Sequence, residues 1–154
     1  MDIQEFLNKQ KIEYEMIYHK PTYDSQRLAQ AVAETGYHVA KTVLLKSDAD
    51  YILAVVPATN TIDLADVGVM FRSNVLVLAT EEEADELFPD CEAGVIPPFG
   101  SQYGLTTLLD EALSEVDEIV FEGNTHDEAV RMNYADYFEL EKPVVTRLSH
   151  PEND

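Results

Sequence analysis

The most constraining feature of this sequence is the segment G-V-I-P-P-F-G at residues 94–100, where two glycines flank two prolines and a phenylalanine. Proline lacks a backbone N–H and fixes φ, so Pro97 and Pro98 can neither continue a helix nor join the middle of a sheet. Gly94 has no Cβ and lets the backbone approach a ligand closely. The segment therefore predicts either a structural loop or a rigid pocket wall made of backbone groups, and the pattern favours neither.

Short strands alternate with short helices around this segment. Hydrophobic spacing predicts helices over residues 3–11, 25–34, 63–70, 80–88 and 134–140. Alternation and apolar runs predict strands over residues 12–18, 42–46, 51–56, 75–78, 106–109, 118–121 and 128–132. Because several strands form hairpins rather than a strict β-α-β repeat, we expect one α+β domain with a mixed sheet. The domain should cover residues 1–148, with residues 149–154 as a frayed tail.

Length and composition exclude several classes of protein. With 154 residues the chain fits one globular domain, and no apolar run approaches the ~20 residues of a membrane span. The N-terminus M-D-I-Q-E-F-L-N-K is polar and acidic, which is not typical of a signal peptide. The single cysteine, Cys91, cannot form an intramolecular disulfide, and its neighbours Asp90 and Glu92 disfavour a thiolate. We therefore expect a cytoplasmic protein in which Cys91 has no chemical role.

The net charge is strongly negative. Thirty acidic and ten basic side chains give a formal charge of −20, which repels nucleic acids and anionic membranes at long range. Solubility or a salty habitat explains such a surface without any functional role. A nucleic-acid substrate would instead need basic residues gathered around its site, and the candidates are Lys20, Arg27, Lys41, Lys46, Arg72 and Arg131.

Lys41 opens a predicted strand in the stretch A-K-T-V-L-L-K. Strand alternation places Lys41 on the same face as the apolar residues Val43 and Leu45. A lysine in this position either extends its ammonium group past the strand end into solvent or reaches into a cleft. The pattern alone favours the first interpretation.

Two histidines lie in predicted loops. His126 ends the loop G-N-T-H between two strands, where it could act as a general base, a hydrogen-bond donor or an ordinary surface residue. His19 follows the first predicted strand. The sequence contains no zinc, calcium, Walker, dinucleotide or G-x-S-x-G motif. We therefore expect neither a metal nor a cofactor.

Three stretches in this order resemble the YbaK-like aminoacyl-tRNA editing domain family. They are A-K-T-V-L-L-K, G-V-I-P-P-F-G-S-Q-Y-G-L and F-E-G-N-T-H-D-E-A-V-R-M-N-Y-A-D-Y, and the similarity spans residues 12–143. The family includes free-standing deacylases and the insertion domain of bacterial prolyl-tRNA synthetases. The resemblance implies a mixed, partly barrel-like sheet surrounded by short helices, with no metal. It also implies hydrolysis, in trans, of the ester that joins an amino acid to a mischarged tRNA.

The resemblance also assigns roles to individual residues. Lys41 matches a lysine that the family needs for activity, Gly94 and Pro98 match its G-x-x-x-P loop, and His126 matches a histidine of one subset. The expected catalytic residues are therefore Lys41, Gly94 and His126. The expected substrate-binding residues are Val95, Ile96, Pro97, Pro98, Phe99, Gly100, Asn124, Thr125 and His19.

The implied substrate is a small amino acid, such as alanine or cysteine, on the acceptor end of tRNA-Pro. Prolyl-tRNA synthetase or an elongation factor is the expected partner, and no membrane is involved. Two alternatives stay open. One is a non-catalytic module that keeps the pocket for a ligand or a synthetase, and the other is hydrolysis of a small acyl ester, which the acidic surface would suit.

Overall fold

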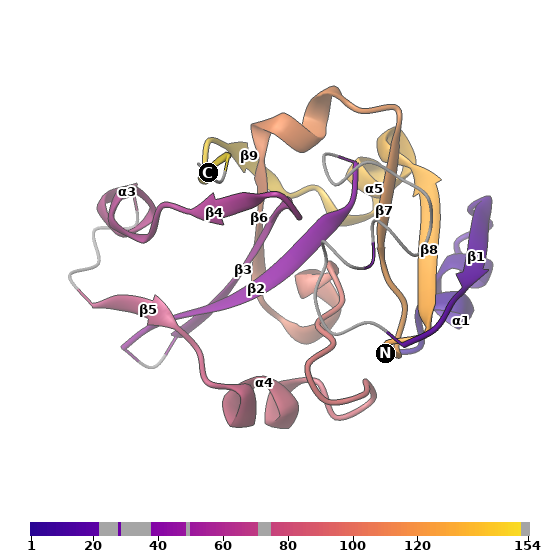
Figure 1. Cartoon of the computed structure of the whole chain (residues 1–154), viewed down its shortest axis with the longest axis horizontal. Helices are drawn as coiled ribbons and strands as arrows, with labels where there is room; N and C mark the ends of the chain where they lie inside the picture. Colours follow the sequence, from indigo (N-terminus) through magenta and orange to yellow (C-terminus); the bar gives the residue numbers. More distant parts are fainter. Residues whose placement is uncertain (22–27, 29–37, 49, 71–74, 152–154) are drawn as a thin grey trace.

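The computed structural model describes residues 1–21, 28, 38–48, 50–70 and 75–151 (Figure 1). Its helices are α1 (Ile3–Lys9), α3 (Leu64–Met70), α4 (Glu81–Leu87) and α5 (Tyr134–Glu141), with 3₁₀ helices η1 (Gly100–Tyr103) and η2 (Glu111–Glu115). Its strands are β1 (Tyr14–Tyr18), β2 (Ala40–Ser47), β3 (Asp50–Pro57), β4 (Asn60–Ile62), β5 (Leu76–Leu78), β6 (Thr106–Asp110), β7 (Glu118–Glu122), β8 (Glu128–Asn133), β9 (Val144–Thr146) and β10 (Ser149–Pro151). The helix expected over residues 25–34 lies outside the described residues, apart from Leu28.

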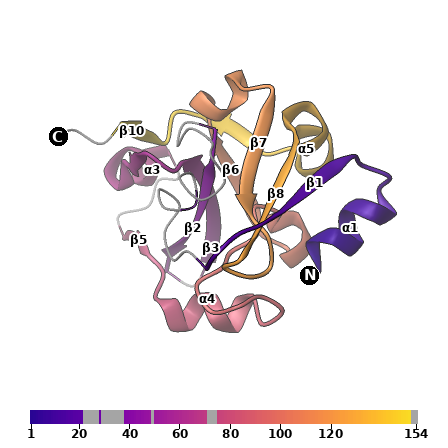
Figure 2. The ribbon, with the colours of Figure 1, turned by 45° about the vertical axis from the view of Figure 1, so that its right-hand side comes forward.

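The strands form a mixed α+β architecture, as expected. The largest sheet has the order β5-β2-β3-β6-β9; β2 and β3 make the expected antiparallel hairpin, whereas β6 runs parallel to both β3 and β9. A second, antiparallel sheet has the order β1-β8-β7 and lies on the side of α1 and α5 (Figures 1 and 2). A parallel bridge between Val39 and Val120 connects the two sheets.

Strand β3 is the centre of the large sheet. Residues 53–56 of this strand have no exposed surface, because side chains cover both faces. Ala54 and Val56 pack in one cluster with Val67 of α3, while Leu53 packs in another cluster with Phe88, at the end of α4. Burial on both faces explains why this strand reads as a continuous apolar run rather than an alternating one.

Local sequence signals fix the starts of α4 and α5. Thr80 accepts a hydrogen bond from the Glu83 N–H, and the Glu83 carboxylate accepts one from the Thr80 N–H, which is the expected capping box of α4. Asn133 caps α5 through bonds from the N–H groups of Ala135 and Asp136. Both helices therefore begin where the sequence predicts. Within the described part of the chain, no helix is long and apolar enough to cross a membrane.

The chain end differs from the expectation of a frayed tail. Ser149–Pro151 form β10, which pairs antiparallel with β4. The buried Ser149 hydroxyl donates to the Asp110 carboxylate at 2.6 Å and accepts from the Asn60 amide at 3.0 Å. These polar contacts hold a strand that is too short to show alternation in the sequence. Residues 152–154 lie outside the described part.

Candidate active site

A cavity of about 390 Å³ opens between the large sheet, the start of α4 and the loop that precedes Pro97. The first wall is β2, at residues 42–44. The second is the connection from β5 into α4, where the lining residues are Leu78, Ala79, Thr80, Glu81, Ala84 and Asp85. The third wall contains Ala93, Gly94, Ile96 and His126. The cavity therefore brings together residues from all three sequence stretches that carry the family resemblance.

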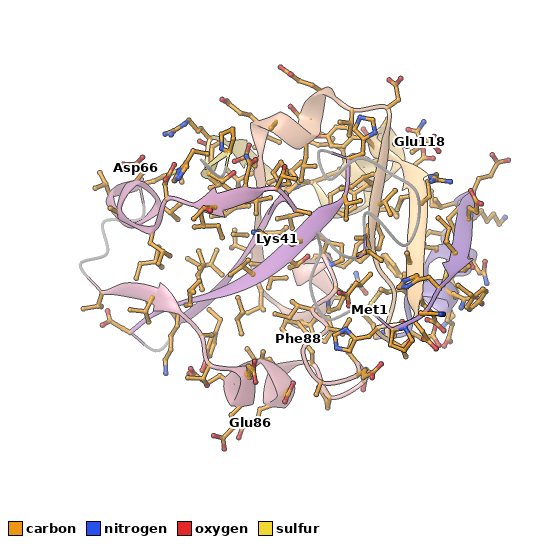
Figure 3. The ribbon with its side chains drawn as sticks, viewed as in Figure 1. Met1, Lys41, Asp66, Glu86, Phe88 and Glu118 are labelled. Carbon is orange, nitrogen blue, oxygen red and sulfur yellow. The ribbon has the colours of Figure 1, made fainter. Side chains whose placement is uncertain are left out.

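The lining of the cavity is mainly apolar. Leu44 and Ala84 belong to a buried cluster with Phe88, and Ile96 packs against the same cluster. Figure 3 labels Phe88 at the end of α4, next to the sheet. A cavity of this volume is at the small end of the range for ligand sites, about 300–1,000 Å³. Its floor therefore suits a small aliphatic side chain.

Residues 94–100 are called the proline segment below, and the first half of this segment forms the wall surface. Gly94 is exposed and has a φ of +88°, a conformation that favours glycine. Val95 is buried, and its N–H donates to the Glu92 carbonyl at 2.9 Å. Ile96, between buried residues on both sides, faces the cavity. Gly94 and Ile96 therefore form the part of this segment that a ligand would meet.

The second half of the segment anchors this wall to the core. The carbonyl of Pro98 accepts a 2.6 Å hydrogen bond from the Tyr137 hydroxyl. Phe99 is 0% exposed, and its ring packs with the rings of Phe6, Phe121 and Tyr137. The N–H of Gly100 donates to the Thr107 hydroxyl at 3.0 Å. Pro97, Pro98, Phe99 and Gly100 were expected to bind substrate, but all four are buried and none is among the described lining residues.

Glu141 is a structural residue that the sequence did not reveal. Its carboxylate, 8% exposed, accepts hydrogen bonds from the Ser101 N–H at 3.0 Å, the Ser101 hydroxyl at 2.6 Å and the Thr107 hydroxyl at 2.7 Å. A buried carboxylate requires several donors to offset its lost hydration. Glu141 therefore ties the end of α5 to the anchored half of the proline segment. The partners are 34 and 40 residues away in the chain, so no local motif announces the contact.

His126 lies at the junction of two loops and is 5% exposed. Its Nε2 lies 2.7 Å from the Ala93 carbonyl oxygen, and its Nδ1 lies 3.2 Å from Oε2 of Glu122. The Ala93 carbonyl oxygen can only accept a hydrogen bond, so Nε2 is the donor in this contact. A Cβ added to Gly94 would stand 3.4 Å from Nε2. His126 therefore supports the Ala93–Gly94 backbone directly and is not an ordinary surface histidine.

Asn124, Thr125 and His19 lie near this loop but are not among the described lining residues. The Asn124 amide accepts from the Ile3 N–H at 2.9 Å and donates to the Met1 carbonyl at 2.6 Å, so it holds the start of α1. The Thr125 hydroxyl donates to the Asp127 carboxylate. The N–H of His19 donates to the Asp127 carbonyl at 3.0 Å. These contacts give all three residues structural partners around the His126 loop.

Lys41 lies in the first half of β2, directly before the lining residue Thr42 (Figure 3). Alternation places its Cβ on the face of Val43 and Leu45, as predicted, and it is not among the described lining residues. Thr42 and Val43 point to opposite faces, yet both line the cavity. The cavity therefore meets the edge of β2, one residue from the start of the Lys41 side chain.

A cluster of Lys46, Tyr51 and Glu83 fixes the start of α4 to β2. The Lys46 ammonium group lies 2.6 Å from Oε2 of Glu83, and the Tyr51 hydroxyl donates to the same oxygen at 2.7 Å. The hydrogen bond from Lys46, followed by those from Thr80 and Tyr51, lowers the pKa of Glu83 to about 2. The carboxylate therefore stays ionised, and it holds the second wall of the cavity against the first.

The described part of the chain contains no charged cluster that suggests a bound metal. Among the residues that the structure describes, no group of three or more His, Cys, Asp or Glu side chains could hold an ion. Cys91 is half-buried, and burial raises the pKa of its thiol. Its sulfur accepts a 3.4 Å contact from the Asn124 amide.

Comparisons with solved structures show that this fold is shared. Among curated proteins no match was found, whereas 28 chains of solved structures match this one. The hypothetical protein APE2540 superposes with a TM-score of 0.86 at 16% identity, over 96% of this chain and 99% of that chain. A candidate trans-editing enzyme for prolyl tRNA synthetase superposes with a TM-score of 0.81 at 24% identity, over 96% and 94% of the two chains.

The fold also occurs inside a longer chain. A candidate signal transduction protein from Marinobacter aquaeolei VT8 superposes with a TM-score of 0.74 at 17% identity, over 96% of this chain but 30% of that one. At these identities the structural likeness shows the shared fold alone. The model of the aminoacyl-tRNA editing domain matches residues 19–140, which include Lys41, Gly94 and His126. The chain therefore belongs to the aminoacyl-tRNA editing domain family.

Proposed function

We propose that this protein is an aminoacyl-tRNA deacylase that acts in trans on a mischarged tRNA. The observation that carries this proposal is the shared cavity, in which the Gly94–His126 wall stands opposite the strand that carries Lys41. Family membership supplies the reaction class. The cavity supplies a place where an ester could lie between a backbone wall and β2, next to the position of Lys41 in that strand.

The reaction needs little beyond positioning. A water oxygen forms a bond to the ester carbonyl carbon, and the carbonyl electron pair moves to oxygen. When the pair returns, the bond to the ribose oxygen breaks; one water proton goes to that oxygen and the other is released from the new carboxylic acid. An aminoacyl ester is already reactive, so orientation and stabilisation of the oxyanion supply most of the acceleration. No serine or cysteine nucleophile is required.

Four residues take the main roles in this proposal. Lys41 holds the terminal phosphate or ribose of the tRNA by charge. The Gly94 backbone orients the aminoacyl group, and His126 fixes that backbone through the Ala93 carbonyl. Ile96 limits the size of the amino acid, since it projects into the cavity. Metal participation forms no part of the proposal.

The proposed substrate is alanine or cysteine on tRNA-Pro. The apolar floor and the small volume support a small amino acid. The similarity to a candidate trans-editing enzyme for prolyl tRNA synthetase supports the choice of tRNA and of prolyl-tRNA synthetase as the proposed partner. The charge of −20 confines contact to the acceptor end, so prolyl-tRNA synthetase or an elongation factor would help to deliver the substrate in the cytoplasm.

A deacylation panel tests the proposal. Purified protein is incubated with Ala-tRNA-Pro, Cys-tRNA-Pro and Pro-tRNA-Pro, and the remaining aminoacyl-tRNA is measured over time. We expect loss of Ala- or Cys-tRNA-Pro, retention of Pro-tRNA-Pro, and no loss with Lys41→Ala. Lys9→Ala, which removes an equal charge from an exposed position on α1, should retain full activity.

Two results would redirect the proposal. Binding of the mischarged tRNA without turnover would indicate a non-catalytic module. Turnover of small aminoacyl esters that uncharged tRNA does not inhibit would indicate a small-ester hydrolase, for which the acidic surface is the supporting observation.

A further inference from the structure

The pairing of β2 with β5 stops where the cavity begins. The two strands pair antiparallel at Leu45–Leu78, Lys46–Val77 and Ser47–Leu76. The ladder extends one step further, because the Ala79 N–H donates to the Leu44 carbonyl at 2.9 Å. After Ala79 the chain leaves the sheet, since Thr80 caps α4. The two strands therefore diverge after this point, and the cavity lies between them.

The next position of this ladder belongs to Thr42. In an antiparallel strand, residues two apart direct their backbone N–H and C=O groups to the same side. The Leu44 carbonyl points towards β5, so the N–H and C=O of Thr42 point the same way, away from β3. The register would place Glu81 opposite Thr42, but Glu81 is already in the first turn of α4. The backbone N–H and C=O of Thr42 thus face the cavity, which Thr42 and Glu81 both line.

An aminoacyl ester has the groups that such an edge binds. Its carbonyl oxygen accepts a hydrogen bond, and its α-ammonium group donates one, with a single carbon between them. A residue in a neighbouring strand presents the same pair of groups to the ladder, and extended ligands commonly bind sheet edges in this way. The substrate would therefore continue the ladder by one residue, in the place that β5 leaves.

We propose that the backbone of Thr42 is a catalytic element of this site: its N–H donates to the ester carbonyl oxygen and its C=O accepts from the α-ammonium group. This inference rests on the proposed deacylase function and deepens it. When water adds to the carbonyl carbon, the negative charge collects on the oxygen that the Thr42 N–H already contacts. A fixed backbone donor in that position stabilises the oxyanion. Lys41, one residue earlier, is then left to hold the phosphate or ribose.

The variant Thr42→Pro tests the donor, because proline removes the N–H and is tolerated at a sheet edge where that group makes no ladder bond. With Ala-tRNA-Pro we expect kcat to fall by about 10²–10³-fold, the effect of losing one oxyanion donor, with little change in KM. Thr42→Val keeps the N–H, so its kcat should exceed that of Thr42→Pro by at least about tenfold. A folded Thr42→Pro protein with wild-type kcat would overturn the inference.

A second measurement uses the wild-type protein and does not depend on the folding of a variant. The ligand is alanine joined by an amide bond to 3′-amino-3′-deoxyadenosine. The amide replaces the ester of the substrate and resists hydrolysis. On titration, the Thr42 amide proton should show the largest downfield shift among the amides of β2 in ¹⁵N–¹H spectra. A bound ligand that leaves this resonance in place would refute the inference.

The two proposals fail in different ways. Wild-type protein that discharges no aminoacyl-tRNA overturns the deacylase function, and the role of Thr42 falls with it. Normal turnover, together with an unshifted Thr42 amide or an unimpaired Thr42→Pro, overturns only the inference about the edge.

Discussion

The two halves of the proline segment have opposite relations to the protein core. Gly94 and Ile96 face the cavity, whereas Phe99, only three residues after Ile96, has no exposed surface and lies among aromatic rings. Between them, the two prolines allow little change of backbone direction. The comparison shows that a wall built from main chain needs a buried anchor close by in sequence. It also separates residues that should affect activity from residues that should affect stability.

The largest expected effect comes from the anchor. Phe99→Ala should lower the free energy of unfolding by about 3–5 kcal/mol, because it removes a fully buried ring from a packed cluster. Urea denaturation followed by circular dichroism measures the loss. Phe138→Ala, at a side chain that is 37% exposed, should change the stability by no more than about 1 kcal/mol. Equal losses for both variants would show that Phe99 is not an anchor.

Gly100→Ala tests the anchor without removing any atom. A Cβ at this position would stand 2.4 Å from the Thr107 hydroxyl oxygen, so the hydroxyl would have to move away from Glu141. We expect a loss of about 1–3 kcal/mol, typical of overpacking, measured by thermal and urea unfolding. The rate of deacylation per folded molecule should stay at the wild-type value. A fully stable variant with reduced turnover would instead place Gly100 on the functional side of the comparison.

Gly94→Ala tests the exposed half. Its φ of +88° makes a side chain unfavourable by roughly 1–2 kcal/mol, and the new Cβ would stand 3.4 Å from Nε2 of His126, another residue that lines the cavity. We therefore expect a large loss in the rate of deacylation and only a small loss in the free energy of unfolding. Gly104→Ala is a matched control: φ is +71° and no atom lies within 4 Å of the added Cβ, so it should show the strain without the loss of turnover. Similar turnover in the two variants would contradict a role for Gly94.

The smallest expected effect concerns the opposite wall and depends on pH. The pKa of Glu83 is lowered to about 2, so its ionised form stabilises the folded state above its ordinary value of 4.5. This contribution should be lost as the pH falls from about 4.5 towards 2. Compared with wild type, Glu83→Gln should be less stable at pH 7, and the difference should shrink over that interval in urea titrations. Glu82→Gln, exposed on the same turn, should show no such convergence.

Local signals in the sequence predicted much of the fold. The Thr80–Glu83 capping box, the Asn133 cap and the β2–β3 hairpin are each made by residues close together in the chain, so their patterns are visible without a structure. The short strands β4, β9 and β10 were not predicted, because three residues show no clear alternation. Long-range polar contacts, such as those of Asp110 with Ser149, decide their positions.

The candidate site was predictable only in part, for a related reason. The glycine and proline pattern identifies a stiff segment, but it does not tell which half of that segment is buried. Contacts with Tyr137 and Glu141, 39 and 40 residues away in the chain, decide that. The assignment of Asn124 to substrate binding is likewise unsupported by its contacts, since the start of the chain occupies its amide. The roles of Lys41, Gly94 and His126 stay predictions.

The position of Ile96 has an evolutionary consequence. Among residues 95–100 it alone lines the cavity, while its neighbours Val95 and Pro97 are buried. Exchange of this one side chain would deepen or fill the cavity without disturbing the anchor below. For the proposed deacylase, a single codon would therefore set which amino acid fits the cavity.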